Sequence, residues 1–370
     1  METNLREQLG KMICEKRTEV KRIDEHSYKV NSQSGNGVYD VFSTELGWKC
    51  SCPDYTFRGV KCKHIFAVEF SLSIRKEVEV RKIEPITNIS SCIFCGSQNL
   101  MKWGIRHNKF GDIQKFYCKE CGKYFTINIG FEKMKHNPQA ITSAMQLYFN
   151  GESLRNTMES LRLLGVEVSH QTVYNWIKKY ISLMENYVEK LKPNVSDTWR
   201  ADELWVKVKG NMKYLFALMD DETRYWIAQE VADTKYTHDA RNLFKMGKEI
   251  SGKKPLTIIT DGLRAYQDAC TKEFYTKHNP RTKHIREIRL SGEVHNNKME
   301  RMNGEIRDRE KVMRGLKKTD TPILKGYQIY HNYIRPHEAL EGKTPADRCG
   351  IEVKGDNKWI TLIQNASKDI

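Results

Sequence analysis

Long apolar runs are absent from this chain of 370 residues. No run approaches the roughly 18 residues that a membrane-spanning helix needs. Residues 1–21 lack the apolar stretch of a secretory signal, and the chain shows neither an internal repeat nor a low-complexity tract. We therefore expect a cytoplasmic protein without a membrane partner.

Acidic residues are outnumbered by basic ones, 47 against 62, so the formal net charge is +15. This excess favours a polyanionic partner. Nucleic acid ranks ahead of an acidic membrane surface, because no amphipathic basic terminal segment stands out. Hydrophobic residues make up 39% of the chain and aromatic residues 10%, which argues against a wholly disordered protein. The length suggests two or three domains.

Ten cysteines are present. Six of them lie in three closely spaced pairs, and a seventh stands two residues before a histidine. In a chain without a signal peptide, this spacing indicates metal binding rather than disulfides. The first cluster lies in a strand, turn, strand and helix pattern over residues 39–72. It offers three thiolates and one imidazole to a tetrahedral structural Zn²⁺, from Cys50, Cys52, Cys62 and His64. Three buried thiols beside a surface histidine are the alternative.

The second cluster consists of two Cys-x2-Cys pairs, each followed by a glycine that lets backbone amides approach the sulfur atoms. Such pairs predict a zinc ribbon, with a redox Cys-x-x-Cys pair as the alternative. The ligands would be Cys92, Cys95, Cys118 and Cys121. Basic and aromatic residues between the pairs either contact DNA or form a solvated face: Lys102, Trp103, Arg106, His107, Lys109 and Lys115.

Helical periodicity dominates residues 137–180. Two glycines separate three predicted helices, near 138–149, 152–164 and 169–181. Ser169 is a good N-cap for the third helix, which turns apolar residues to the core. Its opposite face can contact bases and phosphates in the manner of a helix-turn-helix, through Gln171, Asn175 and Lys178. An ordinary three-helix bundle with a polar face is the alternative.

The pattern becomes mixed from residue 199 onward. Strands are predicted at 199–208, 214–219, 224–231, 255–260 and 284–288, and helices at 237–250, 263–274 and 296–318. The order βββαβαβα gives one mixed sheet with helices on its faces. We therefore predict an α/β domain here.

Three acids occupy places in such a sheet that converge at one edge: the first strand, the end of the fourth strand, and the first turns of the last helix. They are Asp202, Asp261 and Glu300. Three carboxylates suit Mg²⁺ or Mn²⁺, and two such ions about 4 Å apart clamp the attacking and leaving oxygens of a phosphodiester. Basic residues on or near the face of the helix acid would hold the DNA backbone: Arg307, Lys311 and Arg314.

Five further acids compete for this role. Asp220 and Asp221 lie in a predicted turn, where aspartate is common for backbone reasons. Glu203 should point to the face of its strand opposite the first acid. Glu305 lies about 140° around the helix from the third acid, and Glu310, at about 280°, is less clearly excluded.

The segment from about 137 to 350 resembles the DDE transposases of prokaryotic insertion sequences, which have a ribonuclease H-like core. It is most similar to the single-protein transposases that form cointegrates. The matching motifs are GESLR at 151–155, VSHQTV at 168–173, ADE at 201–203, TDG at 260–262, NNKME at 296–300, YIRPH at 333–337 and GKTPA at 342–346. The resemblance implies Asp202, Asp261 and Glu300 as the catalytic triad, and Arg307 as the basic residue that follows the glutamate.

The two zinc modules also resemble known ones. The first cluster is similar to the SWIM zinc finger, and the second to ribbons fused ahead of some such transposases. The SWIM-like finger departs from the family pattern, because the relatives either lack it or carry it after the catalytic core. Its role is therefore open between DNA ends, target DNA and a partner protein.

These expectations divide the chain into an N-terminal region at 1–85, a zinc ribbon at 88–130, a helix-turn-helix domain at 137–192, a catalytic domain at 196–350 and a tail at 351–370. The leading hypothesis is a transposase that binds terminal inverted repeats, cuts DNA and transfers the 3′-OH to a target. Because two ends must meet, we expect a dimer or larger synaptic complex at the prokaryotic nucleoid. A DNA-binding protein without catalysis and a host nuclease of the same fold are the alternatives.

Overall fold

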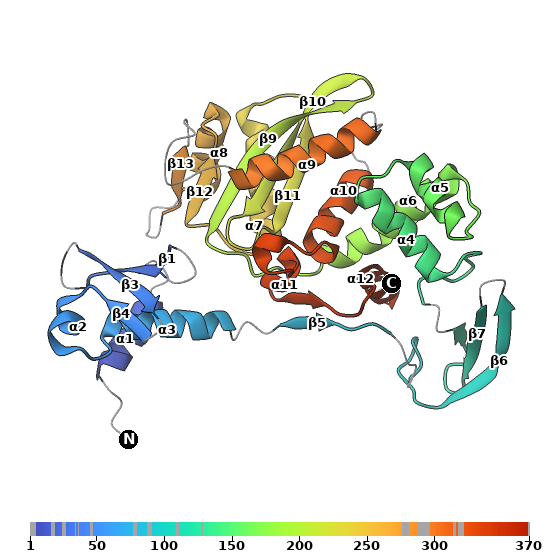
Figure 1. The fold of residues 1–370 in the computed structure, drawn as a ribbon, viewed down its shortest axis with the longest axis horizontal. Helices are drawn as coiled ribbons and strands as arrows, with labels where there is room; N and C mark the ends of the chain where they lie inside the picture. Colours follow the sequence, from blue (N-terminus) through green and yellow to red (C-terminus); the bar gives the residue numbers. More distant parts are fainter. Residues whose placement is uncertain are drawn as a thin grey trace. The chain divides into compact units, whose positions relative to one another are not determined.

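The computed structural model describes residues 5–15, 19–23, 27–33, 35, 37–44, 47–76, 80–86, 91–108, 111–126, 129–275, 281–286, 297–313, 316 and 322–368. The chain divides into two compact units, Met1–Glu79 and Val80–Ile370 (Figure 1). None of the described helices is both long enough and apolar enough to span a membrane.

The first unit is a small α/β domain. Its antiparallel sheet consists of β1 (Val20–Arg22), β2 (Ser27–Asn31), β3 (Val38–Thr44) and β4 (Gly47–Cys50). Its helices are α1 (Leu5–Glu15), α2 (Pro53–Arg58) and α3 (Lys63–Lys76). The predicted strand, turn, strand and helix pattern is confirmed. Two strands and a helix precede it, and they enlarge a core that a lone hairpin is too small to build.

The second unit begins with β5 (Arg81–Ile83) and a three-stranded antiparallel sheet. The strands of this sheet are β6 (Leu100–Asn108), β7 (Gly111–Cys118) and β8 (Tyr124–Thr126). Its core is small and contains two cysteines, Cys92 and Cys118, beside Phe125. A core of this size is too small to stabilise a fold alone, and such modules usually need a bound metal or another cross-link.

Three helices follow at the predicted places: α4 (Pro138–Phe149), α5 (Leu154–Leu163) and α6 (His170–Val188). A side-chain oxygen caps each N-terminus, and Ser169 accepts a hydrogen bond from the Thr172 N–H as expected. Helix α6 runs past its predicted end at 181, because Met184 and Tyr187 continue the buried apolar stripe.

The predicted βββαβαβα order is confirmed. Strands β9 (Thr198–Val208), β10 (Asn211–Asp220), β11 (Trp226–Ala232), β12 (Thr257–Thr260) and β13 (Lys283–Arg286) form a sheet in the order β11-β10-β9-β12-β13. The first three strands are antiparallel, whereas β12 and β13 run parallel to β9. Helices α7 (Thr237–Ser251) and α8 (Arg264–Phe274) pack together, and α9 (Asn297–Met313) packs on β9 (Figure 1). This is the mixed sheet of the ribonuclease H-like fold.

The final segment is part of the core of the second unit, which corrects the predicted tail at 351–370 and the predicted boundary at 85. Strand β14 (Ile351–Val353) pairs in parallel with β5, and α12 (Lys358–Lys368) packs against α4 and α6. The two paired strands lie at opposite ends of this unit in sequence, so no local pattern predicts their contact. Helices α10 (Pro322–Ile329) and α11 (Pro345–Arg348), the π-helix η1 (Tyr330–Ile334) and the short η2 (Glu338–Leu340) lead to them.

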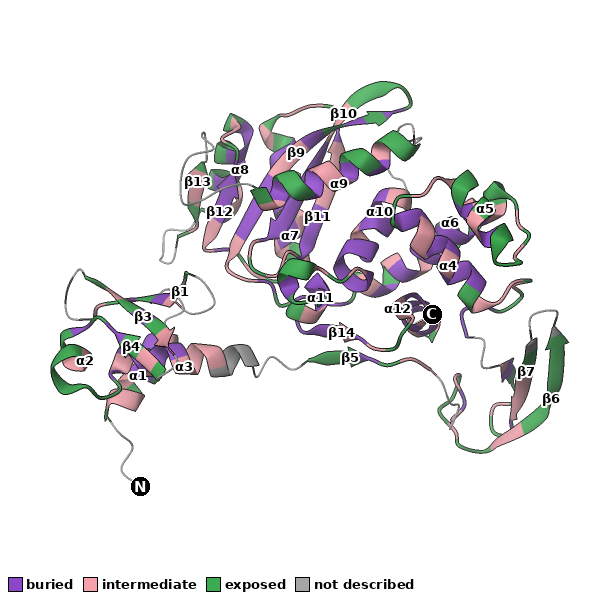
Figure 2. Cartoon of the chain, in the orientation of Figure 1, coloured by how far each residue is buried: buried purple, intermediate pink, exposed green. Residues whose placement is uncertain are grey.

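Buried residues run without a break from the three helices α4–α6 into the mixed sheet and the C-terminal helices (Figure 2). Helix α6 packs directly against α10 and α12. Helices α4–α6 and the mixed sheet therefore share one hydrophobic core, which fixes their relative position.

Candidate active site and zinc clusters

Three carboxylates converge where β12 ends beside β9. Asp202 and Glu203 lie in β9, and Asp261 directly follows β12. Oxygen atoms of the three side chains all lie within 4.8 Å of one another. Strand β12 pairs with β9 through Ile259, opposite Arg200, so it ends before it reaches the two acids of β9. The open edge lets carboxylates from both faces of β9 meet at Asp261.

Glu203 belongs to this group, although strand alternation argues against it. The two neighbouring acids do meet different partners: Asn303 of α9 binds Asp202, whereas Lys235, ahead of α7, donates to Glu203 Oε1 at 3.2 Å. Alternation determines the face on which a side chain starts, but at an open strand edge both faces are within reach. Glu203 is thus an acid of this site that side-chain alternation alone does not predict.

The electrostatics of the site centre on Asp202. Burial, together with the negative charges of Glu203, Asp261 and Glu300, raises the pKa of this carboxyl to about 7. The Glu203 N–H opposes this by donating to Asp202 Oδ1 at 3.0 Å. Acids that repel one another in a half-buried site are stabilised by a bound cation, and all-oxygen donors suit Mg²⁺ or Mn²⁺. The residues therefore fit a divalent metal.

Glu300 lies beside this group rather than within it. It occupies the first turn of α9, and its side chain is exposed. Among the described residues, the acids within 4.8 Å of one another do not include it. Its charge still contributes to the raised pKa of Asp202. The structure therefore brings two of the three predicted acids together and places the third on the helix that touches them.

Asp220 and Asp221, two of the competing acids, have structural roles. Asp220 is buried and accepts hydrogen bonds from the backbone N–H and the hydroxyl of both Ser196 and Thr223. Asp221 pairs with Arg200 at 2.5 Å and with Lys298, in the first turn of α9, at 2.9 Å. These contacts fix the turn after β10 and the start of α9.

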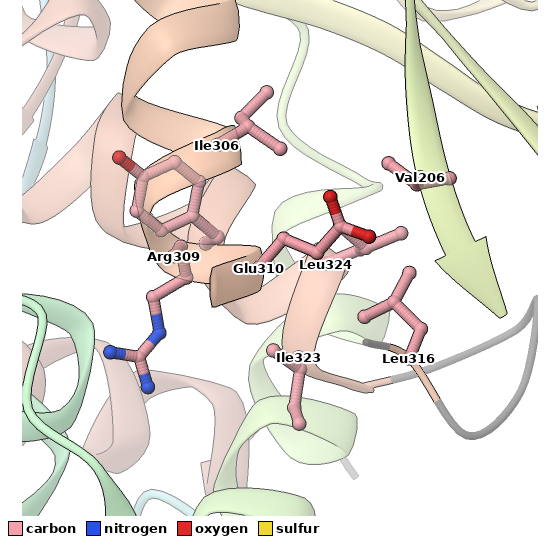
Figure 3. A pocket seen from close by; sticks show the side chains of 8 residues that line it. Val206, Ile306, Arg309, Glu310, Leu316, Ile323 and Leu324 are labelled. Carbon is pink, nitrogen blue, oxygen red and sulfur yellow. The ribbon is translucent and has the colours of Figure 1, made fainter. Parts of the chain in front are cut away.

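The two acids farther along α9 are also engaged away from the metal group. Glu305 accepts two hydrogen bonds from the Arg335 guanidinium, at 2.5 and 3.1 Å. Glu310 accepts a hydrogen bond from the Lys207 backbone N–H, and Figure 3 shows its side chain in a mostly apolar pocket beside Val206 of β9. Helix α9 is thus anchored at both acids.

Two of the three predicted basic residues lie on the same helix. Arg307 and Lys311 are exposed, and Lys311 pairs with Asp308 at 2.9 Å. Arg314 lies outside the described residues.

Arg309 carries no motif that singles it out in the sequence, yet it joins α9 to the helix-turn-helix region. Its side chain is buried, it donates to the Glu152 carbonyl at 2.9 Å, and its guanidinium carbon lies 3.9 Å from the ring centroid of Tyr148. Figure 3 shows the guanidinium pointing away from Glu310 and the pocket interior.

Helix α6 presents the predicted contact residues to solvent. Gln171, Asn175 and Lys178 are all exposed, and Gln171 Nε2 donates to Asn175 Oδ1 at 3.1 Å. Val173 and Trp176 on the other side are buried. One face of α6 is therefore exposed and polar, and the other packs into the core.

The first cysteine cluster forms in the first unit as the spacing predicts. Cys50 ends β4, Cys52 precedes α2, and His64 lies in the first turn of α3 close after Cys62. The four side chains are buried, with their ligand atoms within 4.8 Å of one another. His64 Nδ1 lies 3.8 Å from Cys50 Sγ and 3.9 Å from Cys62 Sγ. A hydrogen bond from Cys50 lowers the pKa of the Cys62 thiol to about 4, so a thiolate is ready for zinc.

The four predicted ribbon cysteines likewise bring their sulfur atoms within 4.8 Å of one another. The glycine after each pair has a left-handed backbone, with φ of 73° at Gly96 and 68° at Gly122. Their N–H groups donate to the carbonyls of Cys92 and Cys118 at 2.9 Å. At the first pair the Phe94 N–H also approaches the Cys92 sulfur, at 3.4 Å, as expected of such a turn. Four thiols fit a tetrahedral zinc.

Residues 196–337 match the DDE domain family, and residues 39–73 match the SWIM zinc finger. The transposase for insertion sequence-like element IS431mec from Staphylococcus aureus is 31% identical over 135 residues, which cover 35% of this chain and 58% of that protein. The insertion element ISM1 uncharacterized 48.3 kDa protein from Methanobrevibacter smithii is 26% identical over 204 residues, covering 50% of this chain and 49% of that protein. The chain thus spans only part of the length of these relatives.

Two solved structures of viral integrases match part of the chain. The HTLV-2 integrase catalytic core domain in complex with magnesium is 19% identical, with a TM-score of 0.31, and the match covers 43% of this chain and 98% of that chain. A simian T-cell lymphotropic virus intasome is 15% identical, with a TM-score of 0.34, over 56% of this chain and 74% of that chain. The fold assignment itself follows from the strand order. Residues 196–337 form a DDE domain similar to those of insertion-sequence transposases, and residues 39–73 form a SWIM zinc finger.

Proposed function

We propose that this chain is a DNA transposase that binds the terminal inverted repeats of its insertion sequence, cuts there and joins the freed 3′ end to target DNA. The observation that carries the proposal is the approach of Asp202 and Asp261 to within 4.8 Å at the end of β12. The DDE domain match and the insertion-sequence relatives support the same activity.

Asp202, Asp261 and Glu300 would hold two Mg²⁺ or Mn²⁺ ions, with Glu300 supplied by α9. Such ions activate water and neutralise charge on the phosphate under attack. Asn303 holds the Asp202 carboxylate in one orientation through their 2.8 Å hydrogen bond. Lys235 offsets part of the negative charge at Glu203.

The reaction takes place in two balanced steps. In the first, a water oxygen bonds to phosphorus at the end of the element and the phosphorus–O3′ bond breaks. A 5′-phosphate and a 3′-OH result, with the proton lost by water matched by the one gained at O3′. In the second, this 3′ oxygen attacks a phosphorus of the target, and the displaced target O3′ takes up the proton. No bond to the protein forms, so its residues act by positioning and electrostatics.

The remaining surfaces would bind DNA. Gln171, Asn175 and Lys178 of α6 would read the terminal repeats in the major groove. On or after α9, Arg307, Lys311 and Arg314 would hold the DNA backbone.

Each zinc module would hold one structural Zn²⁺. The two modules would add DNA contacts or, in the SWIM finger, a partner contact. Because two ends must be joined together, the active form would be a dimer or larger, acting at the nucleoid.

A strand-transfer assay tests the proposal. It combines the DNA that flanks the gene, a supercoiled target and Mg²⁺ with wild type, Asp261→Asn and Asp268→Asn, the last an exposed α8 acid that serves as the matched control. We expect joined products from wild type and Asp268→Asn only, while Asp261→Asn still binds the flanks. Binding without joining by wild type would instead support a DNA-binding protein, and cutting without joining would support a nuclease.

A further inference from the structure

A partly exposed aromatic pair spans β9 and β10 beyond the acids. Trp205, two residues after Glu203 on the same face, is 45% exposed. Tyr214 of β10 is its direct cross-strand partner, with ring centroids 4.1 Å apart. The Lys235 Nζ lies 4.8 Å from the Tyr214 centroid and 5.6 Å from that of Trp205. Trp205, Tyr214 and Lys235 are called the aromatic platform below.

The platform breaks the pattern of its own strand. Leu204, Val206 and Val208 on the opposite face are almost completely buried in the core. On the platform's face the core extends as far as Phe216, which is buried and packs against Tyr266 of α8. Beyond it this face meets solvent, and the exposed Lys207 is polar as such a position predicts. Trp205 is apolar there, so a large ring is held partly in solvent.

The platform lies close to the acids along β9. Trp205 lies three residues along β9 from Asp202, about 10 Å at the rise of a strand, which is the length of a few nucleotides at about 3.4 Å of rise per strand phosphate. Lys235 connects the two sites, because it binds Glu203 Oε1 at 3.2 Å and also lies over both rings. Trp205 shares the face of Glu203 rather than that of Asp202, so a DNA strand that runs from the acids along the Glu203 face of β9 passes the platform.

The chemistry of the platform matches a nucleobase. Aromatic rings bind bases by stacking, without regard to sequence, when cations nearby attract the backbone. Lys235 and the exposed Lys207 supply positive charge beside the rings. Within a duplex, base faces are covered by their neighbours, so only a base that has left the stack presents a face to Trp205.

We propose that the aromatic platform stacks an unpaired nucleobase of the DNA strand next to the phosphate bound at Asp202 and Asp261. The inference rests on the proposed function and adds to it a preference for frayed DNA ends. Stacking on the platform returns part of the cost of opening the duplex, and it holds the strand in place beside the acids.

The test uses the full chain and the DNA that flanks its gene, with 2-aminopurine at each of the three bases nearest the cut, in Mg²⁺-free buffer. One set of duplexes is fully paired and the other has splayed ends. We expect wild type to quench the probe and to bind splayed ends about fivefold or more tightly. Trp205→Ala should lose both effects, and Trp205→Phe should keep them.

Tyr275→Ala is the control, since Tyr275, directly after α8, is an aromatic residue that is 62% exposed and belongs to none of the proposed DNA-binding surfaces. It should leave the splayed-to-paired ratio unchanged. If Trp205→Ala quenched the probe as strongly as wild type does, the inference would be overturned. If this variant also changed its oligomeric state in light scattering, the platform would instead lie between copies of the chain.

This experiment distinguishes failure of the aromatic platform from failure of the proposed function. A wild type that binds and joins the flanking DNA without a splayed-end preference overturns the platform alone. A wild type that binds none of the flanking DNA overturns the proposed function and the platform together.

Discussion

Asn303 of α9 donates a hydrogen bond from Nδ2 to Oδ2 of Asp202 in β9, at 2.8 Å. Asn303 is only 4% exposed, and its Oδ1 has no hydrogen-bond partner among the described residues. Burying an amide whose oxygen has no partner lowers the stability of the fold. The benefit of Asn303 at this position is therefore its hydrogen bond to Asp202. It joins the helix that carries Glu300 to the strand that carries Asp202.

Replacing Asn303 with alanine should slow cleavage about 10- to 100-fold, because a hydrogen bond to a charged group contributes about 1.5–3 kcal/mol. Loss of a donor to the carboxylate also raises the pKa of Asp202, so the acidic limb of the rate profile should move to higher pH. Cleavage rates across pH measure both effects. Asn156→Ala, at an exposed asparagine of α5, is the control, and an unmoved pH limb in Asn303→Ala would contradict a positioning role.

Without divalent ions, stability should fall as pH rises from about 4 to about 7. The folded pKa of Asp202 is raised to about 7 from an ordinary value of 3.8, so the folded state holds its proton more tightly in this window and loses that advantage as the proton leaves. Thermal unfolding at several pH values measures the trend. Asp202→Asn should flatten it, whereas Asp268→Asn should not.

Mg²⁺ should raise the unfolding midpoint of wild type at pH 8 and have little effect at pH 5. At the higher pH the acids are ionised, and a bound cation relieves their repulsion. The buffer should be freed of metal on a resin, since a soluble chelator would also remove zinc. An equal Mg²⁺ shift in Asp202→Asn would exclude this carboxylate as a ligand.

Arg335→Ala should lower the free energy of unfolding by about 1–3 kcal/mol, because it removes a two-pronged ion pair with Glu305 that holds α9. Arg348→Ala removes an ion pair with the more exposed Glu341 and a 3.4 Å hydrogen bond to the Leu340 carbonyl, and it should cost about 0–1 kcal/mol. Denaturant titration compares the two variants. Equal losses would show that the Glu305 pair does not anchor the helix.

Cys62→Ser should release one of about two zinc ions per chain and destabilise the first unit, since metal binding contributes directly to the folding of such modules. Metal analysis of the purified protein gives the count. Cys270→Ala is the control, because Cys270 of α8 belongs to the core of the other unit. A zinc content unchanged in Cys62→Ser would contradict the assignment of this cluster.

Lys178→Ala should weaken binding to all DNA sequences alike and reduce the salt dependence by about one phosphate contact. Gln171→Ala should instead relax the preference for the terminal repeat, by about 1–3 kcal/mol. Binding to flanking and scrambled duplexes at several salt concentrations separates the two. Identical behaviour of the variants would argue against α6 as the recognition helix.

Much of the chain is predictable from local patterns. Ligand spacing identifies the cysteine clusters, because nearby thiols need little more than a turn and a glycine such as Gly96 to meet. Periodicity identifies α6 and its buried stripe. The strand and helix order of the mixed sheet follows from alternation and apolar runs.

The rest depends on where distant segments end and meet. Three contacts leave no local trace in the sequence: the pairing of β5 with β14, the Asn303–Asp202 bond and the packing of buried Arg309 on Tyr148 of α4.

Glu203 shows most clearly what local sequence patterns do not predict. Alternation along the strand predicts that Glu203 and Asp202 start on opposite faces. That both reach Asp261 depends on the folded sheet, because the pairing of β12 with β9 stops short and leaves the edge of β9 open.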